Sequence, residues 1–302
     1  MNITFIGYGE VGRILAEELR AQQHTVAAYD LKLGGAAGQA LHEHAEQHGV
    51  SLAASHPAAV RSAELVVCAV TASQTLAAAQ ACAGTLKPGS FYLDFNSASP
   101  GAKISAAAAV NQGGARYVEG AVMTSIPSYR IKVPLLLGGP DAAALEPLLK
   151  SLGFAPRVVS EKLGVASATK MCRSVMIKGL EAMVIESFTT ARHYGVEDAV
   201  IASLQETFPA IDWEAQGAYF FQRVIEHGRR RAKEVREVAV TVGEAGLESW
   251  SATGTAQRQA FMADLADAGI FGTRGAPGFA RSADWRVEAD RLLQHIRGRD
   301  EL

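Results

Sequence analysis

The order of apolar segments along the chain constrains its fold more than any other feature. From residue 1 to about residue 160, short apolar runs typical of strands alternate with stretches of helical periodicity. Strands separated by helices of about ten to fifteen residues form βαβ units, in which the strands run parallel. We expect strands at residues 3–6, 25–29, 64–70, 90–95, 116–119 and 133–137, with helices such as 11–21, 75–83 and 102–111 between them.

The strand pattern ends near residue 160, and the remaining sequence is helical in pattern. One long helix is expected at 163–194, closed by Gly195, followed by helices at 196–207, 212–227, 229–243, 249–268 and 286–297. The change of period predicts an α/β Rossmann-type domain at residues 1–162 and an all-α substrate and dimerisation domain at residues 163–302. Because the long helix is too apolar for one small domain to cover, we also expect a homodimer formed through the helical domain.

Composition and charge argue against several classes of function. Hydrophobic residues make up 48% of the chain, charged residues 20%, and the formal net charge is −2, so nothing favours a nucleic-acid partner or an anionic membrane. No apolar run approaches the ~18 residues of a membrane span, and no signal-peptide pattern precedes the first strand. The three cysteines are widely spaced, which argues against a disulfide framework or a metal site. We expect a cytoplasmic protein that binds a small molecule.

A Gly-x-Gly-x-x-Gly motif stands between the first strand and the first helix. Gly7 permits the tight turn after the strand, Gly9 lets the backbone approach a pyrophosphate, and Gly12 lets the helix pack against the strand. The N-terminus of that helix offers N–H groups to phosphates. This context predicts a dinucleotide-binding loop formed by Gly7, Tyr8, Gly9, Glu10, Val11 and Gly12.

The second strand ends at an acidic residue, Asp30, where a carboxylate can accept hydrogen bonds from the adenosine ribose. A carboxylate there repels a 2′-phosphate and therefore favours NAD. Lys32 stands two residues further on and could balance a phosphate, so NADP stays open.

Four segments in this order resemble the β-hydroxyacid dehydrogenase superfamily, which includes 3-hydroxyisobutyrate dehydrogenase, tartronate semialdehyde reductase and 6-phosphogluconate dehydrogenase. They are residues 5–12 (FIGYGEVG), 94–101 (DFNSASPG), 118–125 (VEGAVMTS) and 168–187 (ATKMCRSVMIKGLEAMVIES). Residues 227–246 resemble the uncharacterised C-terminal domain that accompanies one branch of this superfamily.

The resemblance implies that Val70, Thr71 and Asn96 contact the cofactor and that Ser97 contacts the substrate. The sequence also permits a structural role for this serine-rich segment. Ser97 or Ser99 would cap a helix that begins at Pro100. The two interpretations are compatible.

Lys170 matches the family's catalytic lysine, which stands near the start of the long interdomain helix and moves the hydroxyl proton. A lysine can do this where burial or a neighbouring cation lowers its pKa. Lys170, Ser174 and Lys178 follow at i, i+4 and i+8 and therefore share one helix face, which is either a site face or a solvated stripe. The resemblance implies catalytic roles for Lys170 and Ser174.

The chain departs from the family pattern at several positions. Ser174 replaces an asparagine, and Ile177 replaces the general-acid glutamate of decarboxylating members, so that Glu181 is the remaining candidate acid. Where members that act on small hydroxy acids carry a serine and two glycines, this chain has Met123, Thr124 and Ser125, whose Cβ atoms would reshape the substrate pocket. Val122, just before them, is also expected to contact the substrate.

These features predict an NAD(P)-dependent oxidoreductase that interconverts a hydroxyl and a carbonyl group, with a decarboxylating or isomerising enzyme and a non-catalytic nicotinamide sensor as alternatives. His227 is expected to contact substrate, because the His-Gly pair stands at a predicted helix junction. Arg230 and Arg231 either join it or form a solvated face that pairs with Glu234 and Glu237.

Overall fold

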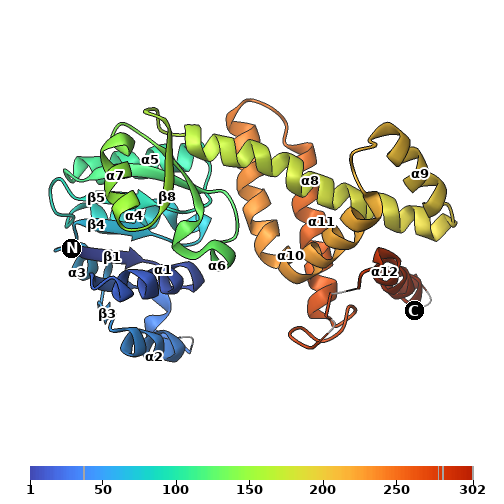
Figure 1. Cartoon of the computed structure of the whole chain (residues 1–302), viewed down its shortest axis with the longest axis horizontal. Helices are drawn as coiled ribbons and strands as arrows, with labels where there is room; N and C mark the ends of the chain where they lie inside the picture. The colour runs from blue at the N-terminus through green and yellow to red at the C-terminus, as the bar shows by residue number, and fades with distance from the viewer. Residues whose placement is uncertain (37, 278, 281, 301–302) are drawn as a thin grey trace. The chain divides into compact units, whose positions relative to one another are not determined.

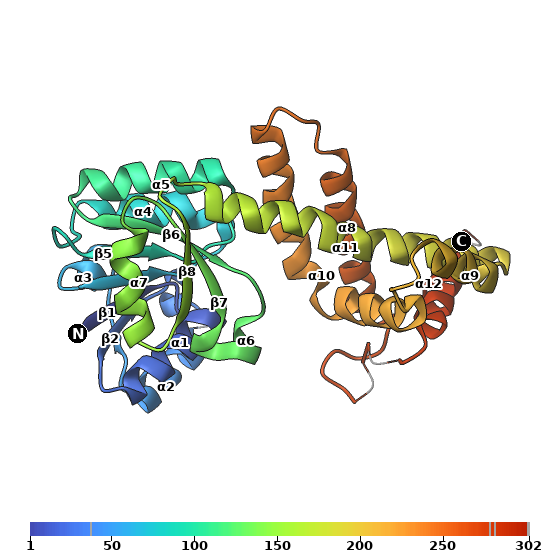
Figure 2. The ribbon, with the colours of Figure 1, turned by 45° about the horizontal axis from the view of Figure 1, so that its top comes forward.

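The computed structural model describes residues 1–36, 38–277, 279–280 and 282–300. The chain divides into two compact units, Met1–Met171 and Cys172–Leu302, and the division falls inside the helix α8, Val165–Tyr194. Figure 1 and Figure 2 show the elements of each unit. The predicted domain limits at residues 162 and 163 remain a prediction, because a division by contacts does not test which segment folds independently.

The N-terminal unit is built on one eight-stranded sheet in the order β3-β2-β1-β4-β5-β6-β7-β8. All neighbouring strands run parallel except β6 and β7, which are antiparallel. The strands are β1 Asn2–Ile6, β2 Thr25–Tyr29, β3 Ser51–Leu52, β4 Leu65–Cys68, β5 Phe91–Asp94, β6 Arg116–Val122, β7 Pro134–Gly138 and β8 Ala155–Ser160. The predicted α/β class is confirmed.

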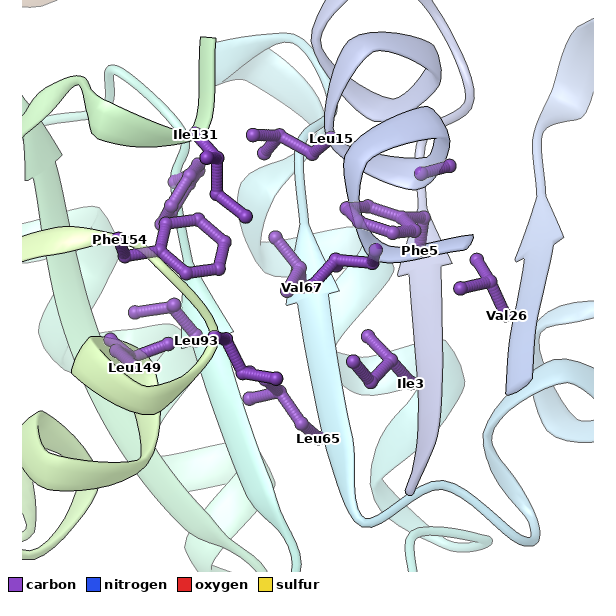
Figure 3. Close-up of a cluster of buried hydrophobic side chains, with 14 of the residues drawn as sticks. Ile3, Phe5, Leu15, Val26, Leu65, Val67, Leu93, Ile131, Leu149 and Phe154 are labelled. Atoms are coloured by element: carbon purple, nitrogen blue, oxygen red, sulfur yellow. The ribbon is translucent and has the colours of Figure 1, made fainter. Parts of the chain in front are cut away.

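Helices cover both faces of this sheet, and side chains that alternate along the strands form a separate core on each face. Ile3 and Phe5 of β1 belong to the core that contains Leu15 of one helix, whereas Ile6 packs with Ala79 and Val110 on the other face. Figure 3 shows part of the first core. The helices of the unit are α1 Glu10–Ala21, α2 Gly38–His48, α3 His56–Val60, α4 Thr75–Ala83, α5 Pro100–Gln112, α6 Ile126–Tyr129 and α7 Ala142–Ser151, with 3-10 turns at Leu31–Gly34, Ala72–Gln74 and Arg130–Lys132.

The C-terminal unit is helical. It contains most of α8 together with α9 Glu197–Thr207, α10 Trp213–Glu244, α11 Trp250–Asp267 and α12 Trp285–Asp300. Phe188, Phe221 and Trp285 lie in its core, and α10 packs along α11. Within the described part of the chain, no helix has the length and apolarity needed to cross a membrane.

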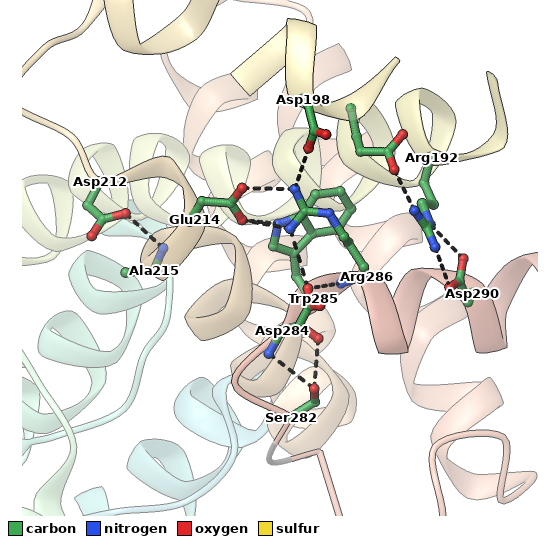
Figure 4. Close-up of polar contacts among 11 residues, drawn as sticks. Arg192, Asp198, Asp212, Glu214, Ala215, Ser282, Asp284, Trp285, Arg286 and Asp290 are labelled. Atoms are coloured by element: carbon green, nitrogen blue, oxygen red, sulfur yellow. Dashed lines mark hydrogen bonds and ion pairs between the residues drawn. The ribbon is translucent and has the colours of Figure 1, made fainter. Parts of the chain in front are cut away.

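Arginines join the ends of the helices in this unit. Arg192 of α8 hydrogen-bonds both carboxylate oxygens of Asp290 on α12, at 2.8 and 2.9 Å. Arg286 likewise bonds both oxygens of Glu214 on α10 and reaches Asp198 on α9 (Figure 4). Three helices are thereby connected to α12 through bidentate or shared arginine contacts, which fix geometry better than single ion pairs do.

The two helices predicted at 212–227 and 229–243 are one continuous helix, α10, so this prediction is wrong. Gly228 does not end a helix. A Cβ atom at this position would lie 2.7 Å from the backbone oxygen of Gln259 and 3.3 Å from Cβ of Ala263, both on α11. The glycine therefore serves the close approach of two helices, and His227 lies in the middle of a helix rather than at a junction.

Candidate cofactor and catalytic site

The glycine-rich loop has the geometry of a phosphate-binding turn. Gly7 adopts a φ of 95°, and a Cβ atom there would lie 2.4 Å from the backbone oxygen of Ala69. A Cβ atom at Gly12 would lie 2.3 Å from the oxygen of Gly7, so α1 packs directly on the turn. At Gly9, by contrast, no described atom lies within 4 Å of the position a Cβ would take. The first and third glycines serve the fold, and the middle one borders open space.

The N-terminus of α1 faces this space without a capping side chain. The helix begins at Glu10, and its N-cap is Gly9, for which no side-chain cap bond is found among the described residues. N–H groups in the first turn of a helix need an external partner, and a phosphate can supply it. The residues present therefore fit a dinucleotide pyrophosphate.

Asp30, at the end of β2, holds the loop from one side. One of its carboxylate oxygens accepts the backbone N–H of Tyr8 at 2.8 Å, and the other accepts that of Lys32 at 2.9 Å. The Tyr8 side chain is buried, and its hydroxyl lies 2.8 Å from Nδ1 of His44. Burial raises the pKa of Tyr8 to about 12, so its hydroxyl stays protonated at neutral pH. The carboxylate proposed to bind ribose therefore also orders the phosphate loop.

Asn96 joins the carboxyl ends of β4 and β5. Its side-chain oxygen accepts the N–H of Val70 at 2.8 Å, and its amide nitrogen donates to Sγ of Cys68 at 3.3 Å. Below it, the buried Asp94 pairs with the buried Lys103 at 2.9 Å and accepts the backbone N–H of Asn96 at 2.8 Å. Both polar atoms of the amide thus have protein partners, which fixes the strand ends where the predicted cofactor contacts Val70, Thr71 and Asn96 lie.

Lys170 and Ser97 lie together, although they are far apart in the sequence. Nζ of Lys170 donates to Oγ of Ser97 at 2.5 Å, and the lysine is partly buried. Ser97 is free for this contact because Ser99, not Ser97, caps α5 by accepting the N–H of Ala102 at 3.3 Å. Ser99 is therefore the helix cap, and the substrate contact of Ser97 remains a prediction.

Glu119 holds the start of α8, and sequence reasoning missed this residue. Its fully buried carboxylate accepts the N–H of Gly164 at 2.7 Å and also that of Ser167. A carboxylate at a helix N-terminus satisfies free N–H groups and interacts favourably with the helix dipole. Lys170 follows one turn later, so Glu119 positions the segment that carries it. An acidic residue inside an apolar strand was the available signal.

The structure also places the remaining predicted substrate residues and Ser174, the second predicted catalytic residue. Val122 ends β6 and is buried, Met123 is partly buried, and Thr124 and Ser125 are exposed before α6. Ser174 and His227 belong to the C-terminal unit, where Ser174 is buried and His227 is exposed on α10. Burial lowers the pKa of His227, although the neighbouring Glu226 acts in the opposite direction. Their predicted roles remain predictions.

A buried ionic cluster in the C-terminal unit accounts for several residues whose roles the sequence left open. The fully buried Glu181 forms an ion pair with Arg231 and accepts from Gln259 at 3.2 Å. Lys178 pairs with Glu234 at 2.9 Å, and its burial lowers its pKa while Glu234 acts to raise it. The contacts with Arg231 and Gln259 occupy the Glu181 carboxylate in the packing of the helices. This argues against its use as the acid of a decarboxylating enzyme. Arg230 makes the expected exposed i, i+4 contact with Glu234.

The sheet, the glycine loop and the uncapped helix N-terminus define the class: an α/β nucleotide-binding protein with a helical C-terminal unit. Residues 2–159 match the family described as the NAD binding domain of 6-phosphogluconate dehydrogenase, and the chain belongs to this family. Residues 191–262 match a domain of unknown function, DUF1932. The resemblance predicted from four segments and a C-terminal run is confirmed.

Three solved structures show how far the likeness extends. A conserved hypothetical protein from Sinorhizobium meliloti is 34% identical, with 97% of this chain and 96% of that chain covered and a TM-score of 0.79. A conserved protein of unknown function, described as structurally similar to 3-hydroxyacid dehydrogenases, is 26% identical, with 89% and 98% covered and a TM-score of 0.71. The 3-hydroxyisobutyrate dehydrogenase of Mycobacterium tuberculosis is 16% identical, with 96% and 98% covered and a TM-score of 0.72, which shows the shared fold.

Proposed function

We propose that this protein is an NAD(P)-dependent dehydrogenase or reductase that interconverts a hydroxyl and a carbonyl group in a small, carboxylate-bearing molecule. The observation that carries the proposal is the 2.5 Å contact between Nζ of Lys170 and Oγ of Ser97. Membership of a nicotinamide-binding dehydrogenase family supports the cofactor class. A protein that only senses the cofactor has no need for an amine beside the strand ends.

Lys170 is the general acid and base in this proposal. In its neutral form, Nζ donates one N–H to Ser97 and keeps its lone pair for the hydroxyl proton of the substrate. During oxidation the amine accepts that proton, and during reduction it returns the proton to the oxygen. The bound nicotinamide supplies the hydride acceptor or donor. Ser97 holds the amine, and Glu119 holds the helix turn that precedes it.

NAD is the proposed cofactor, with NADP as the alternative. Asp30 at the end of β2 places a negative charge where a 2′-phosphate would sit, while Lys32 is exposed. The substrate is proposed to be bulkier than a three- or four-carbon hydroxy acid or anchored differently, because the Cβ atoms of Met123, Thr124 and Ser125 stand where the family's serine and glycines approach the substrate carboxylate.

The test combines cofactor binding with turnover. The wild type is screened against a panel of hydroxy acids and the corresponding oxo acids, with NAD and NADP, by the nicotinamide absorbance. Lys170→Ala should bind NADH as the wild type does, within about twofold, and lose about 10²–10⁴-fold in turnover because a positioned acid or base contributes that much. Lys162→Ala, an exposed lysine just before α8, is the matched control and should retain full activity.

Each of the other outcomes has a defined meaning. Unchanged turnover in Lys170→Ala would contradict the mechanism. Tight NADH binding without turnover of any substrate would favour the cofactor sensor. A product with fewer carbon atoms than its substrate would favour a decarboxylating enzyme.

A further inference from the structure

A second cluster of chemically active side chains lies beside the glycine-rich loop, where α1 and α2 meet. Glu17 of α1 and His44 and His48 of α2 each direct one ligand atom into a space in which these atoms lie within 4.8 Å of one another. Nε2 of His44 is 3.0 Å from a carboxylate oxygen of Glu17, and the centroids of the His44 and His48 imidazole rings are 4.5 Å apart. All three residues are partly buried.

We propose that Glu17, His44 and His48 form a binding site for a divalent transition-metal ion such as Zn²⁺. Zinc binds imidazole nitrogen and carboxylate oxygen at about 2.0–2.2 Å, so ligand atoms of a tetrahedral site lie about 3.3 Å apart. The observed separations need only a small inward movement of the side chains. Two histidines at i and i+4 share one helix face, as in helical zinc sites. Imidazole ligands favour Zn²⁺, Cu²⁺ or Ni²⁺ over Mg²⁺ or Ca²⁺.

The groups around the cluster match what a metal site requires of its surroundings. A metal-bound histidine usually donates its other ring N–H to an oxygen, and the Tyr8 hydroxyl lies 2.8 Å from Nδ1 of His44. Arg130 bonds the second oxygen of Glu17 at 2.6 Å and leaves the first oxygen directed at His44. The contact with Arg130 therefore holds the Glu17 carboxylate in place beside His44.

Metal binding changes the tautomer of His44 and releases no proton. Without metal, the two contacts of His44 fit the tautomer in which the Nε2 N–H donates to Glu17 and Nδ1 accepts from the Tyr8 hydroxyl. With metal, Nε2 becomes a ligand, the ring proton moves to Nδ1, and Tyr8 accepts it. Because Tyr8 stands between Gly7 and Gly9, the ion would fix α2 to the loop that binds the cofactor phosphates. The cysteine count did not suggest this site, and the spacing of the histidines in HEHAEQH was the available signal.

The experiment measures Zn²⁺ itself and does not depend on activity. Chain without a polyhistidine tag is stripped with a chelator, dialysed against Zn²⁺ and analysed for metal content, and Co²⁺ is used to read the coordination geometry from its visible absorption. We expect one equivalent of metal, tetrahedral Co²⁺ bands, and a rise in Tm with Zn²⁺, because a ligand that binds only the folded state stabilises it.

Two histidine variants on the same helix make the test specific. His48→Ala should weaken Zn²⁺ binding at least about tenfold and abolish the rise in Tm. His42→Ala removes an exposed histidine of α2 and should leave both unchanged. His48→Gln serves if the alanine variant does not fold. Less than about half an equivalent of zinc in the wild type, or equal losses in the His42 and His48 variants, would overturn the proposal.

Discussion

At the scale of single residues, Asp30 connects the order of the phosphate loop with the choice of cofactor. Replacing it by asparagine removes the charge and keeps an oxygen that can accept the N–H of Tyr8. We expect Asp30→Asn to shift the ratio of NADPH to NADH affinity by about tenfold in favour of NADPH, because repulsion of the 2′-phosphate is lost. Fluorescence titration with both reduced cofactors measures this ratio.

Lys32→Ala is the control for the opposite hypothesis, in which the exposed lysine balances a 2′-phosphate. If Lys32→Ala lowers NADPH affinity and Asp30→Asn leaves the ratio unchanged, NADP is the cofactor and the assignment of Asp30 is incorrect.

Glu119 is the residue on which the placement of Lys170 depends. In Glu119→Ala the N–H groups of Gly164 and Ser167 lose a buried acceptor at the start of α8. The loss of a helix cap combined with unsatisfied buried groups should cost about 2–3 kcal/mol, seen as a lower denaturation midpoint. Glu161→Ala removes an exposed acid a few residues before α8 and should change the midpoint little. Equal midpoints for the two variants would show that the cap is not needed.

At the scale of elements, the sequence predicted what local pattern determines. β4 is a continuous apolar run, and β1 is buried from Ile3 to Ile6 with only Thr4 interrupting its apolar residues. The glycine loop between β1 and α1 adds a further local signal. β3 has two residues, and β8 has a single buried residue, Pro156, between two exposed ones, followed by three partly buried residues, so neither has a strong pattern. Both strands were missed.

The contacts between distant segments were beyond local pattern. In the sequence, Gly228 resembled a helix end. Its actual role is the close approach of α11, which the local pattern does not reveal. In the site, the resemblance predicted Lys170 and Ser97 each as a site residue, and the contact between them was found only in the structure. The two protein partners of the Asn96 amide depend on which strand ends adjoin in the folded sheet. The cap from Glu119 depends on where the start of α8 lies relative to the middle of β6.

Gly228 gives a test at this scale, because helix propensity and packing act in opposite directions. Gly228→Ala should destabilise the protein although alanine favours helices by about 1 kcal/mol, since the new Cβ would lie 2.7 Å from a backbone oxygen of α11. Gly243→Ala in the same helix meets no described atom within 4 Å and should stabilise it by up to about 1 kcal/mol. Thermal unfolding of both variants measures the difference. A stabilised Gly228→Ala would contradict the packing of α10 against α11.

At the scale of the whole molecule, the C-terminal unit leaves apolar side chains exposed along α8. Met176, Met183 and Tyr194 are 71%, 61% and 72% exposed. They border a groove of about 840 Å³ whose other walls come from α9 and α11. Contiguous apolar surface of this kind marks an interface more often than a free surface. The homodimer predicted from the apolar helix is therefore proposed to form on this face.

Light scattering of the purified protein should give the mass of two chains at micromolar concentration. Met183→Glu places a charge at the centre of the proposed interface, where burying it unpaired is costly, and should give the mass of one chain. Leu76→Glu, on the partly exposed surface of α4 in the other unit, is the matched control and should leave the dimer intact. A monomeric wild type would contradict the homodimer. A dimer that tolerates Met183→Glu as well as Leu76→Glu would show that the exposed face of α8 is not the dimer interface.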